Sequence, residues 1–280
     1  MIFGINLLLW TARLDASQAP VLAALKRQGY QGVEVPFFDG TAAEARKAGQ
    51  MVRDAGLLPA MIGTLPDAAH NPLSDNTADQ RRGQDHLHWL VDMAHEMGAT
   101  LIAGPFTQPL GQFTGQGPTP DEFSRMVAAH ASMADRAGPG LRLAVEPLNR
   151  FECYALTTAA EAARLVAAVA RPNYGYLYDT FHAHIEESDP TSALRETLPH
   201  VAHFHLSENH RGTPGSGHAA LGAALGVLRE RGYDRWISVE AFGQSLPEIA
   251  AATRIWRPLF DDPLTLASDA LALIKAHLTP

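Results

Sequence analysis

Short apolar runs alternate with longer segments of helical character along the whole chain. Runs rich in Val, Ile, Leu and aromatic residues predict eight strands, at 2–10, 32–35, 58–63, 100–104, 141–145, 175–178, 201–205 and 236–239. Segments between and after them predict eight helices, near 18–29, 41–55, 77–97, 119–137, 157–169, 191–198, 218–231 and 263–277. Strand followed by helix, eight times, predicts an α/β fold: a single-domain (β/α)8 TIM barrel spanning residues 1–280.

A doubly wound open sheet also alternates strands and helices and is the main alternative. That fold commonly carries a glycine-rich dinucleotide fingerprint after its first strand, and none follows the run at 2–10. The count of eight strands favours closure into a barrel. No linker, low-complexity tract or short-period repeat indicates a second domain.

The charge and cysteine content narrow the class of protein. A formal net charge of −8, without a run of Lys and Arg, argues against a nucleic-acid partner. Cys153 is the only cysteine, so an internal disulfide is impossible and a cytoplasmic, reducing compartment is expected. The apolar start, MIFGINLLLW, lacks a basic leader and is too short to span a bilayer, so we expect no membrane association.

Four ligand-type side chains stand where four successive predicted strands end. Glu146 follows LRLAV, Asp179 follows GYLY, His205 closes VAHFH and Glu240 follows WISV. Their separations of 33, 26 and 35 residues each approximate one strand–helix unit. Because a TIM barrel gathers the carboxyl ends of its strands at one face, we expect these four groups to converge there.

Three carboxylates and one imidazole in one barrel mouth predict a divalent metal ion. Such groups cannot all stay charged and unpaired, and a cation is the simplest resolution. Mostly oxygen ligands with one nitrogen suit Mn²⁺, Mg²⁺ or Co²⁺. The alternative is that each residue is an independent, solvated loop acid. His203 lies on the same strand face as His205 but deeper, and we interpret it as a barrel-interior or supporting histidine.

Further polar residues in the loops after these strands predict a site for a polyhydroxylated substrate. Glu152 follows Glu146 by six residues, His182 follows Asp179 by three, and Arg211 lies in HLSENHRGTPGSG. Taken singly, Glu152 could pair with Arg150 or cap a helix, and His182 could be a solvated loop residue. The GTPGSG segment could cradle a phosphate or form a lid. Its single neighbouring basic residue favours the lid.

The segments EPLNRFE, DTFHAHIEE, HLSENHRGTPGSG and ISVEAF resemble those of the ketose 3-epimerases. This group, which includes D-tagatose, D-psicose (D-allulose) and L-ribulose 3-epimerases, belongs to the xylose-isomerase-like TIM barrel superfamily. The resemblance implies four ligands for one metal ion, with Mn²⁺ expected and Mg²⁺ or Co²⁺ as alternatives: Glu146, Asp179, His205 and Glu240. It also implies that Glu146 and Glu240 transfer the proton.

The same resemblance assigns the substrate-binding residues, which would hold the oxygens around C1 to C3 of the sugar: Glu152, His182 and Arg211. The chain departs from the family pattern in places. Asn6 stands where some relatives carry an aromatic residue, GPFTQPLGQF has no Trp or Tyr, and Thr157 stands where Asn is common. The preferred ketose and its phosphorylation state therefore stay open.

The expected activity is metal-dependent epimerisation of free ketohexoses or ketopentoses at C3, by two-glutamate proton transfer through a cis-enediolate. The pairs would be of the D-tagatose/D-sorbose, D-fructose/D-allulose or L-ribulose/L-xylulose type. Alternatives are an aldose–ketose isomerase resembling hydroxypyruvate isomerase, a sugar-phosphate epimerase, a DNA-repair endonuclease and a non-catalytic sugar-binding barrel. Relatives are homodimers or homotetramers, and the apolar segment TRIWRPLF is a candidate contact.

Overall fold

Eight parallel strands pair in one sheet in the order β1-β8-β7-β6-β5-β4-β3-β2 in the computed structural model, which describes residues 1–278. The strands are β1 (Ile2–Ile5), β2 (Gly32–Pro36), β3 (Leu58–Ile62), β4 (Leu101–Gly104), β5 (Arg142–Val145), β6 (Tyr174–Asp179), β7 (Val201–Leu206) and β8 (Trp236–Val239). A parallel bridge between Asn6 and Glu34 joins the two end strands, β1 and β2. The sheet thus closes on itself, and the predicted TIM barrel is confirmed.

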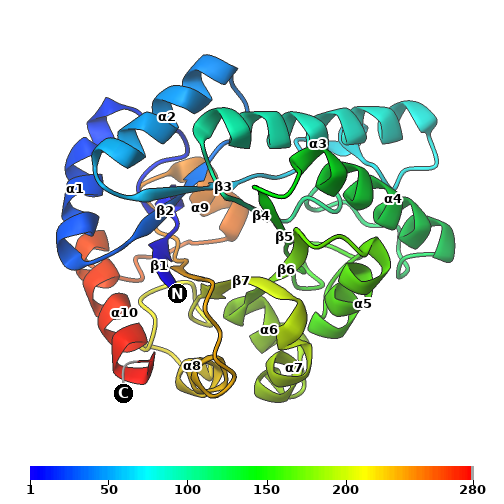
Figure 1. Cartoon of the computed structure of the whole chain (residues 1–280). Coiled ribbons are helices and arrows are strands. Elements are labelled where there is room, and N and C mark those ends of the chain that lie inside the picture. Colours follow the sequence, from blue (N-terminus) through cyan, green and yellow to red (C-terminus); the bar gives the residue numbers. More distant parts are fainter. Residues whose placement is uncertain (279–280) are drawn as a thin grey trace.

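All eight predicted helices form, within a few residues of the expected bounds. They are α1 (Ala19–Gln28), α2 (Ala42–Asp54), α3 (Thr77–Met97), α4 (Pro120–Ala137), α5 (Ala159–Val169), α7 (Pro190–Thr197), α8 (Leu221–Glu230) and α10 (Pro263–Leu278). Figure 1 shows them around the outside of the strands. Within residues 1–278, no helix combines the length and apolar character needed to cross a membrane.

Two further helices were not predicted, α6 (Thr180–Glu186) and α9 (Pro247–Thr253). Each has only seven residues, too few to show a helical period in the sequence. The first begins directly after β6, because the Asp179 carboxylate accepts from the backbone N–H of Phe181 and His182. The prediction that His182 lies in a loop is therefore wrong: this residue is in the first turn of a helix.

The first strand is shorter than the predicted run of 2–10. It ends at Ile5, and residues Leu7–Leu9 form one turn of 3₁₀ helix. The side chain of Asn6 causes this change of direction, since its Oδ1 accepts from the backbone N–H of Leu8 at 3.0 Å. The chain thus turns across the barrel mouth instead of continuing as a strand.

Residues inside the barrel form an apolar cluster below the carboxyl ends of the strands. Its members are Ala60, Ile62, Leu101, Ala103, Ala144, Leu177, Ala202 and Trp236. Small side chains leave room for Trp236, against which Gly32 packs so closely that a Cβ there would lie 2.3 Å from the indole. Because side chains alternate along a strand, the position two residues after Ala144 also points inward, and it is Glu146.

Candidate metal centre

The four predicted metal ligands converge at one end of the barrel. Glu146, Asp179, His205 and Glu240 each offer one ligand atom, and these atoms lie within 4.8 Å of one another. All four side chains are buried. They stand at the carboxyl ends of β5, β6, β7 and β8, four neighbouring strands of the ring. The barrel therefore brings together four residues of which the first and last, Glu146 and Glu240, are 94 residues apart in the chain.

The imidazole of His205 shows that this cluster fits a cation. Its Nδ1 lies 3.5 Å from Asp179 Oδ2 and 3.5 Å from Glu240 Oε1. This buried nitrogen has no hydrogen-bond partner among residues 1–278. A buried lone pair facing two carboxylates is costly unless a positive charge lies between them. Oxygen-rich ligands with one imidazole suit a divalent ion such as Mn²⁺ or Mg²⁺.

The two glutamates of the cluster have opposite pKa shifts. Burial raises the pKa of Glu146 well above its usual value, and the charge of Glu240 raises it further. For Glu240, burial acts in the same direction, but the charges of His205 and Arg211 outweigh it and lower the pKa to about 2. Two carboxyls with such different proton affinities are typical of an acid–base pair.

Arg211 reaches into the cluster from the loop after β7. Its Nη1 donates to Glu240 Oε2 at 2.5 Å and to Asp179 Oδ2 at 3.2 Å. The guanidinium also lies over the ring of Phe181, 3.8 Å from the ring centroid. A left-handed backbone conformation at Arg211, with φ of 64°, directs the side chain inward. This buried cation partly balances the negative charge of the carboxylates.

His182 lies beside Arg211 and is held in one tautomer. Its Nδ1 accepts from the backbone N–H of Asn149 at 3.0 Å, so Nε2 carries the proton. Burial, and then the charge of Arg211, lower the His182 pKa to about 3, so the ring is neutral. Nε2 lies 3.6 Å from Glu146 Oε1 and 3.0 Å from Arg211 Nη2. Two N–H donors, Nε2 of His182 and Nη2 of Arg211, therefore face each other.

The remaining predicted substrate residue, Glu152, lies at the edge of the same mouth. Its Oε1 accepts from Nδ2 of Asn149 at 2.7 Å. Asn149 thus contacts both Glu152 and His182 and links the two segments that carry them. This role of Asn149 was not predicted from the sequence, although the residue lies within the EPLNRFE motif. The alternative, a pairing of Glu152 with Arg150, is absent within the described residues, where Arg150 pairs with Glu186.

Two residues from the first quarter of the chain complete the surroundings of the cluster. Asn6 donates from Nδ2 to Glu240 Oε1 at 3.0 Å. Glu34 lies 3.1 Å from Nε2 of His205. Neither contact was predicted from the sequence. A carboxylate in the middle of the apolar run GVEV was the available signal, because a buried strand seldom carries an unpaired acid.

The glycine-rich segment after β7 is fastened to a buried carboxylate. Glu208 accepts from the backbone N–H groups of Asn209, Gly215 and Ala219 at 3.0, 2.8 and 2.9 Å. Its side chain is fully buried. These N–H groups point at a protein carboxylate, so they are not arranged to receive a phosphate.

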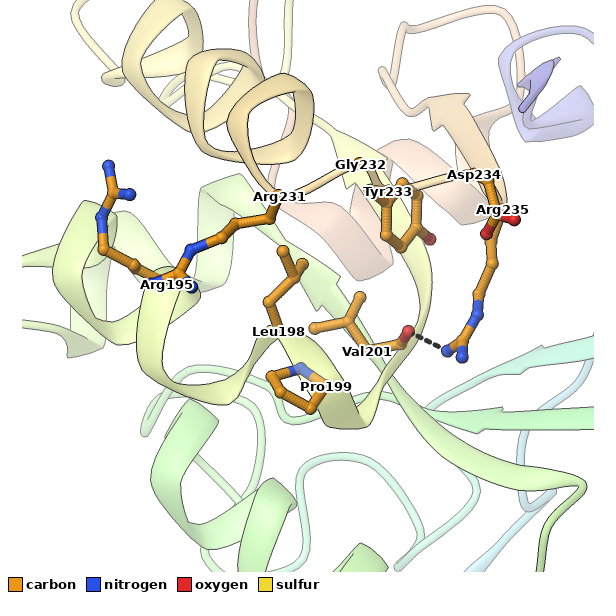
Figure 2. Close-up of a pocket in the computed structure, with 9 residues that line it drawn as sticks. All are labelled: Arg195, Leu198, Pro199, Val201, Arg231, Gly232, Tyr233, Asp234 and Arg235. Carbon is orange, nitrogen blue, oxygen red and sulfur yellow. Dashed lines mark hydrogen bonds between the residues drawn. The ribbon is translucent and has the colours of Figure 1, made fainter.

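A separate hollow of about 290 Å³ lies at the amino ends of β7 and β8. Figure 2 shows Arg195 and Arg231 on one side of it, and Arg235 donating to the backbone oxygen of Val201. Arg195 is already paired with Glu230. This hollow lies at the end of the barrel opposite the carboxylate cluster, where side chains serve stability in most TIM barrels.

The fold and this cluster define a known class of barrel. The sequence model of the xylose isomerase-like TIM barrel family matches residues 22–276, and the chain belongs to that family. Several curated proteins similar to this chain are named ketose 3-epimerases or L-ribulose 3-epimerases, so the predicted resemblance is confirmed. The chain is 30% identical over 283 residues to the ketose 3-epimerase of Arthrobacter globiformis, covering 100% of this chain and 97% of that protein. It is also 30% identical over 279 residues to the L-ribulose 3-epimerase of Mesorhizobium japonicum, covering 98% and 93%.

Solved structures agree with these relatives. The structure of an L-ribulose 3-epimerase superposes with a TM-score of 0.91 at 30% identity, over 99% of this chain and 94% of that one. A D-allulose 3-epimerase from Methylomonas sp. in complex with D-allulose also has a TM-score of 0.91, at 25% identity, over 99% and 97%. The similarity extends over the whole barrel.

Proposed function

We propose that this protein is a metal-dependent ketose 3-epimerase that acts on free ketoses. The observation that carries the proposal is the convergence of Glu146 and Glu240 with Asp179 and His205 in one buried cluster. In addition, two relatives at 30% identity, matched over 97% and 93% of their length, are named a ketose 3-epimerase and an L-ribulose 3-epimerase. The preferred sugar lies among the ketopentoses and ketohexoses, and Mn²⁺ is the expected metal, with Mg²⁺ or Co²⁺ as alternatives.

Epimerisation at C3 removes a proton from a carbon beside a carbonyl and returns one to the opposite face. A single base cannot easily reach both faces, so two groups are needed. Glu146 and Glu240 follow β5 and β8, which lie three strands apart in the ring, and so approach the mouth from different walls. One removes the proton while the other donates, and the direction of reaction exchanges their roles. A divalent ion bound by the four ligands would supply positive charge for the negative charge that develops on the sugar oxygens.

The contact between an N–H donor of Arg211 and one of His182 supports the proposal that a sugar oxygen binds in this mouth. Arg211 Nη2 and the Nε2–H of His182 lie 3.0 Å apart. An acceptor oxygen in reach of both N–H groups would resolve that donor–donor contact, and ketose carbonyl and hydroxyl oxygens are such acceptors. Glu152 at the rim offers a carboxylate that can accept from a sugar hydroxyl. The substrate-binding set is thus Glu152, His182 and Arg211.

An unphosphorylated substrate is favoured by the loop after β7. In many TIM barrels, backbone N–H groups in this region bind phosphate. Here those of Gly215 and Ala219 donate to Glu208 instead. Arg211, the basic residue nearest this loop in sequence, already contacts Asp179 and Glu240.

We also propose a cytoplasmic homodimer or homotetramer. The location follows from the single cysteine, Cys153, which is free and buried. The assembly is supported by Trp256 in the TRIWRPLF segment, which is 70% exposed.

The test is a panel of free and phosphorylated ketoses with Mn²⁺, with products identified by chromatography and solvent deuterium located in the product. Deuterium at C3 with conversion of a free ketose is the expected result. Deuterium at C1 with aldose formation would instead establish an aldose–ketose isomerase. Conversion of phosphorylated ketoses alone would overturn the proposed substrate class.

Glu146→Gln and Glu240→Gln test the proton transfer. Glutamine keeps an oxygen ligand and a similar shape but cannot accept the proton. Each variant, loaded with metal, should lose epimerisation, while slow deuterium exchange into C3 continues from opposite epimers in the two variants. A metal-loaded variant with a turnover near that of the wild type would disprove the two-base assignment.

A further inference from the structure

We propose that Glu34 is a positioning residue of the metal centre, which fixes His205 so that Nδ1 is the nitrogen presented to the metal. This inference rests on the proposed metal-dependent function. Glu34 lies in the middle of β2 and is 171 residues from His205 in the chain. It is none of the four proposed ligands.

The contacts of Glu34 define what its carboxylate does. Both of its oxygens lie 3.1 Å from Nε2 of His205. Its Oε1 also lies 2.5 Å from Nε2 of His203. All three side chains are fully buried. A carboxylate buried at this depth needs N–H donors, and the two imidazoles supply them.

This arrangement selects the tautomer of His205. A neutral imidazole has one N–H, so a proton on Nε2 leaves the lone pair on Nδ1. That lone pair faces Asp179 and Glu240, where a cation fits. Without Glu34, the favoured alternative is an Nδ1–H that donates to those same carboxylates, which removes the nitrogen as a ligand. A carboxylate behind a metal-binding histidine commonly has this orienting role.

Glu34, His203 and His205 are also the residue types of a second metal site, but their geometry argues against one. Ligand atoms bound at 2.0–2.2 Å in a tetrahedral or octahedral shell lie about 3 Å apart or more. The Oε1 of Glu34 and the Nε2 of His203 lie only 2.5 Å apart. A short hydrogen bond fits this distance and two ligands of one ion do not. Glu34 therefore acts through His205.

The experiment compares Mn²⁺ affinity in the wild type, Glu34→Gln and His203→Gln, measured by calorimetry on metal-free protein. In Glu34→Gln the new side-chain amide would place an N–H₂ group near one imidazole N–H, so the preference for the Nε2–H tautomer of His205 is lost. We expect Glu34→Gln to weaken Mn²⁺ binding by about 10- to 100-fold. His203→Gln, which leaves the Glu34–His205 contact in place, should weaken it far less. The Co²⁺ absorption spectrum should change in Glu34→Gln only.

A purely structural role gives a different result. Both variants would then lower the urea midpoint of the metal-free protein, with equal and wild-type Mn²⁺ affinity, and the inference would be overturned. If the wild type itself bound no Mn²⁺, the proposed function would fail rather than the role of Glu34 alone.

A measurement on the unaltered protein covers the case in which Glu34→Gln does not fold. The ¹⁵N shifts of the histidine rings in Mg²⁺-loaded wild type report which nitrogen carries the proton. The proposal requires Nε2–H at His205, with Nδ1 as the unprotonated nitrogen. An Nδ1–H at His205 would overturn it.

Discussion

Asn6 and Glu240, 234 residues apart in the chain, are joined by a hydrogen bond of 3.0 Å from the Asn6 carboxamide to Oε1 of the glutamate. The same Oε1 lies 3.5 Å from Nδ1 of His205, whereas Oε2 accepts from Arg211. Asn6 is itself held, because its Oδ1 accepts from the backbone N–H of Leu8. The orientation of one proposed proton-transfer group is therefore set from both sides of its carboxylate.

Asn6→Ala is expected to reduce kcat/KM by about 10- to 100-fold. The variant removes a donor from a buried, charged acceptor, a loss of about 1.5–3 kcal/mol. Steady-state kinetics with saturating Mn²⁺ provides the measurement. Asn76→Ala is the matched control, since Asn76 also accepts from a backbone N–H two residues on, at 2.8 Å, but lies at the start of α3. If Asn6→Ala and Asn76→Ala had equal kcat/KM values, the contact between Asn6 and Glu240 would not contribute to catalysis.

Metal addition should raise the melting temperature, and by more at pH 8 than at pH 5.5. A bound metal at 100 times its Kd stabilises the native state by about 2.7 kcal/mol. Burial and Glu240 raise the pKa of Glu146, whereas at His205 the charges of Glu34 and Glu240 raise the pKa against the effect of burial.

The metal-free fold thus binds these protons more tightly than the unfolded chain does, and the stability this contributes is lost as pH rises. A metal ion binds only the deprotonated ligands, so the stabilisation by metal also increases as pH rises. Calorimetric melts with EDTA or Mn²⁺ at both pH values test this. Glu230→Gln, at an exposed ion pair, should keep the full response. A metal effect that shrinks with rising pH would contradict the assigned ligands.

Arg211→Ala should raise KM about tenfold or more while sparing Mn²⁺ affinity. The variant removes a proposed donor to a sugar oxygen, and a tenfold change corresponds to about 1.4 kcal/mol. It also removes the guanidinium that pairs with Asp179 and Glu240. The metal ion then no longer competes with Arg211 for these two carboxylates. Arg231→Ala, at the opposite end of the barrel, is the control. A sharp loss of metal affinity with an unchanged KM would show that Arg211 belongs to the metal site instead.

His130→Gln should flatten the acid dependence of stability. His130 is fully buried, its Nδ1 lies 2.5 Å from the Tyr174 hydroxyl, and burial lowers its pKa to about 4. Well above the ordinary histidine pKa of 6.5 the residue is neutral in both states, so its contribution is constant. As pH falls through 6.5 the unfolded chain takes up the proton first, and stability is lost down to about pH 4.

When the pH is lowered from 7.5 to 5, protonation linked to His130 should lower the free energy of unfolding of the wild type by about 2 kcal/mol. Urea unfolding at both pH values measures the difference. The exposed His95 provides the control, as His95→Gln should behave like the wild type. Equal pH dependence in all three proteins would rule out His130 as the cause.

The local parts of this structure are determined by short stretches of sequence. The helices α2, α4 and α5 begin where the sequence reads Thr-x-x-Glu, and in each the threonine and glutamate bond one another's backbone. Gly29 and Gly98 end helices in the left-handed conformation. Such signals act within about four residues, so the positions of strands and helices could be read directly.

The proposed ligands were also accessible from sequence, because a TIM barrel places every strand end at one face whatever the details of its packing. Glu146, Asp179, His205 and Glu240 needed only that rule and their spacing. The short helix α6 was not predicted, because seven residues are too few to show the helical period of apolar positions.

The roles of Asn6, Glu34 and Asn149 were decided by the tertiary structure. Closure of the ring places β1 next to β8, so Asn6 meets Glu240 across 234 residues, and it turns Glu34 towards His205 across 171. A hydrogen bond depends on position and angle to within a few tenths of an ångström. Sequence patterns determine which face a side chain occupies. Only the closed barrel determines which polar atoms on that face meet.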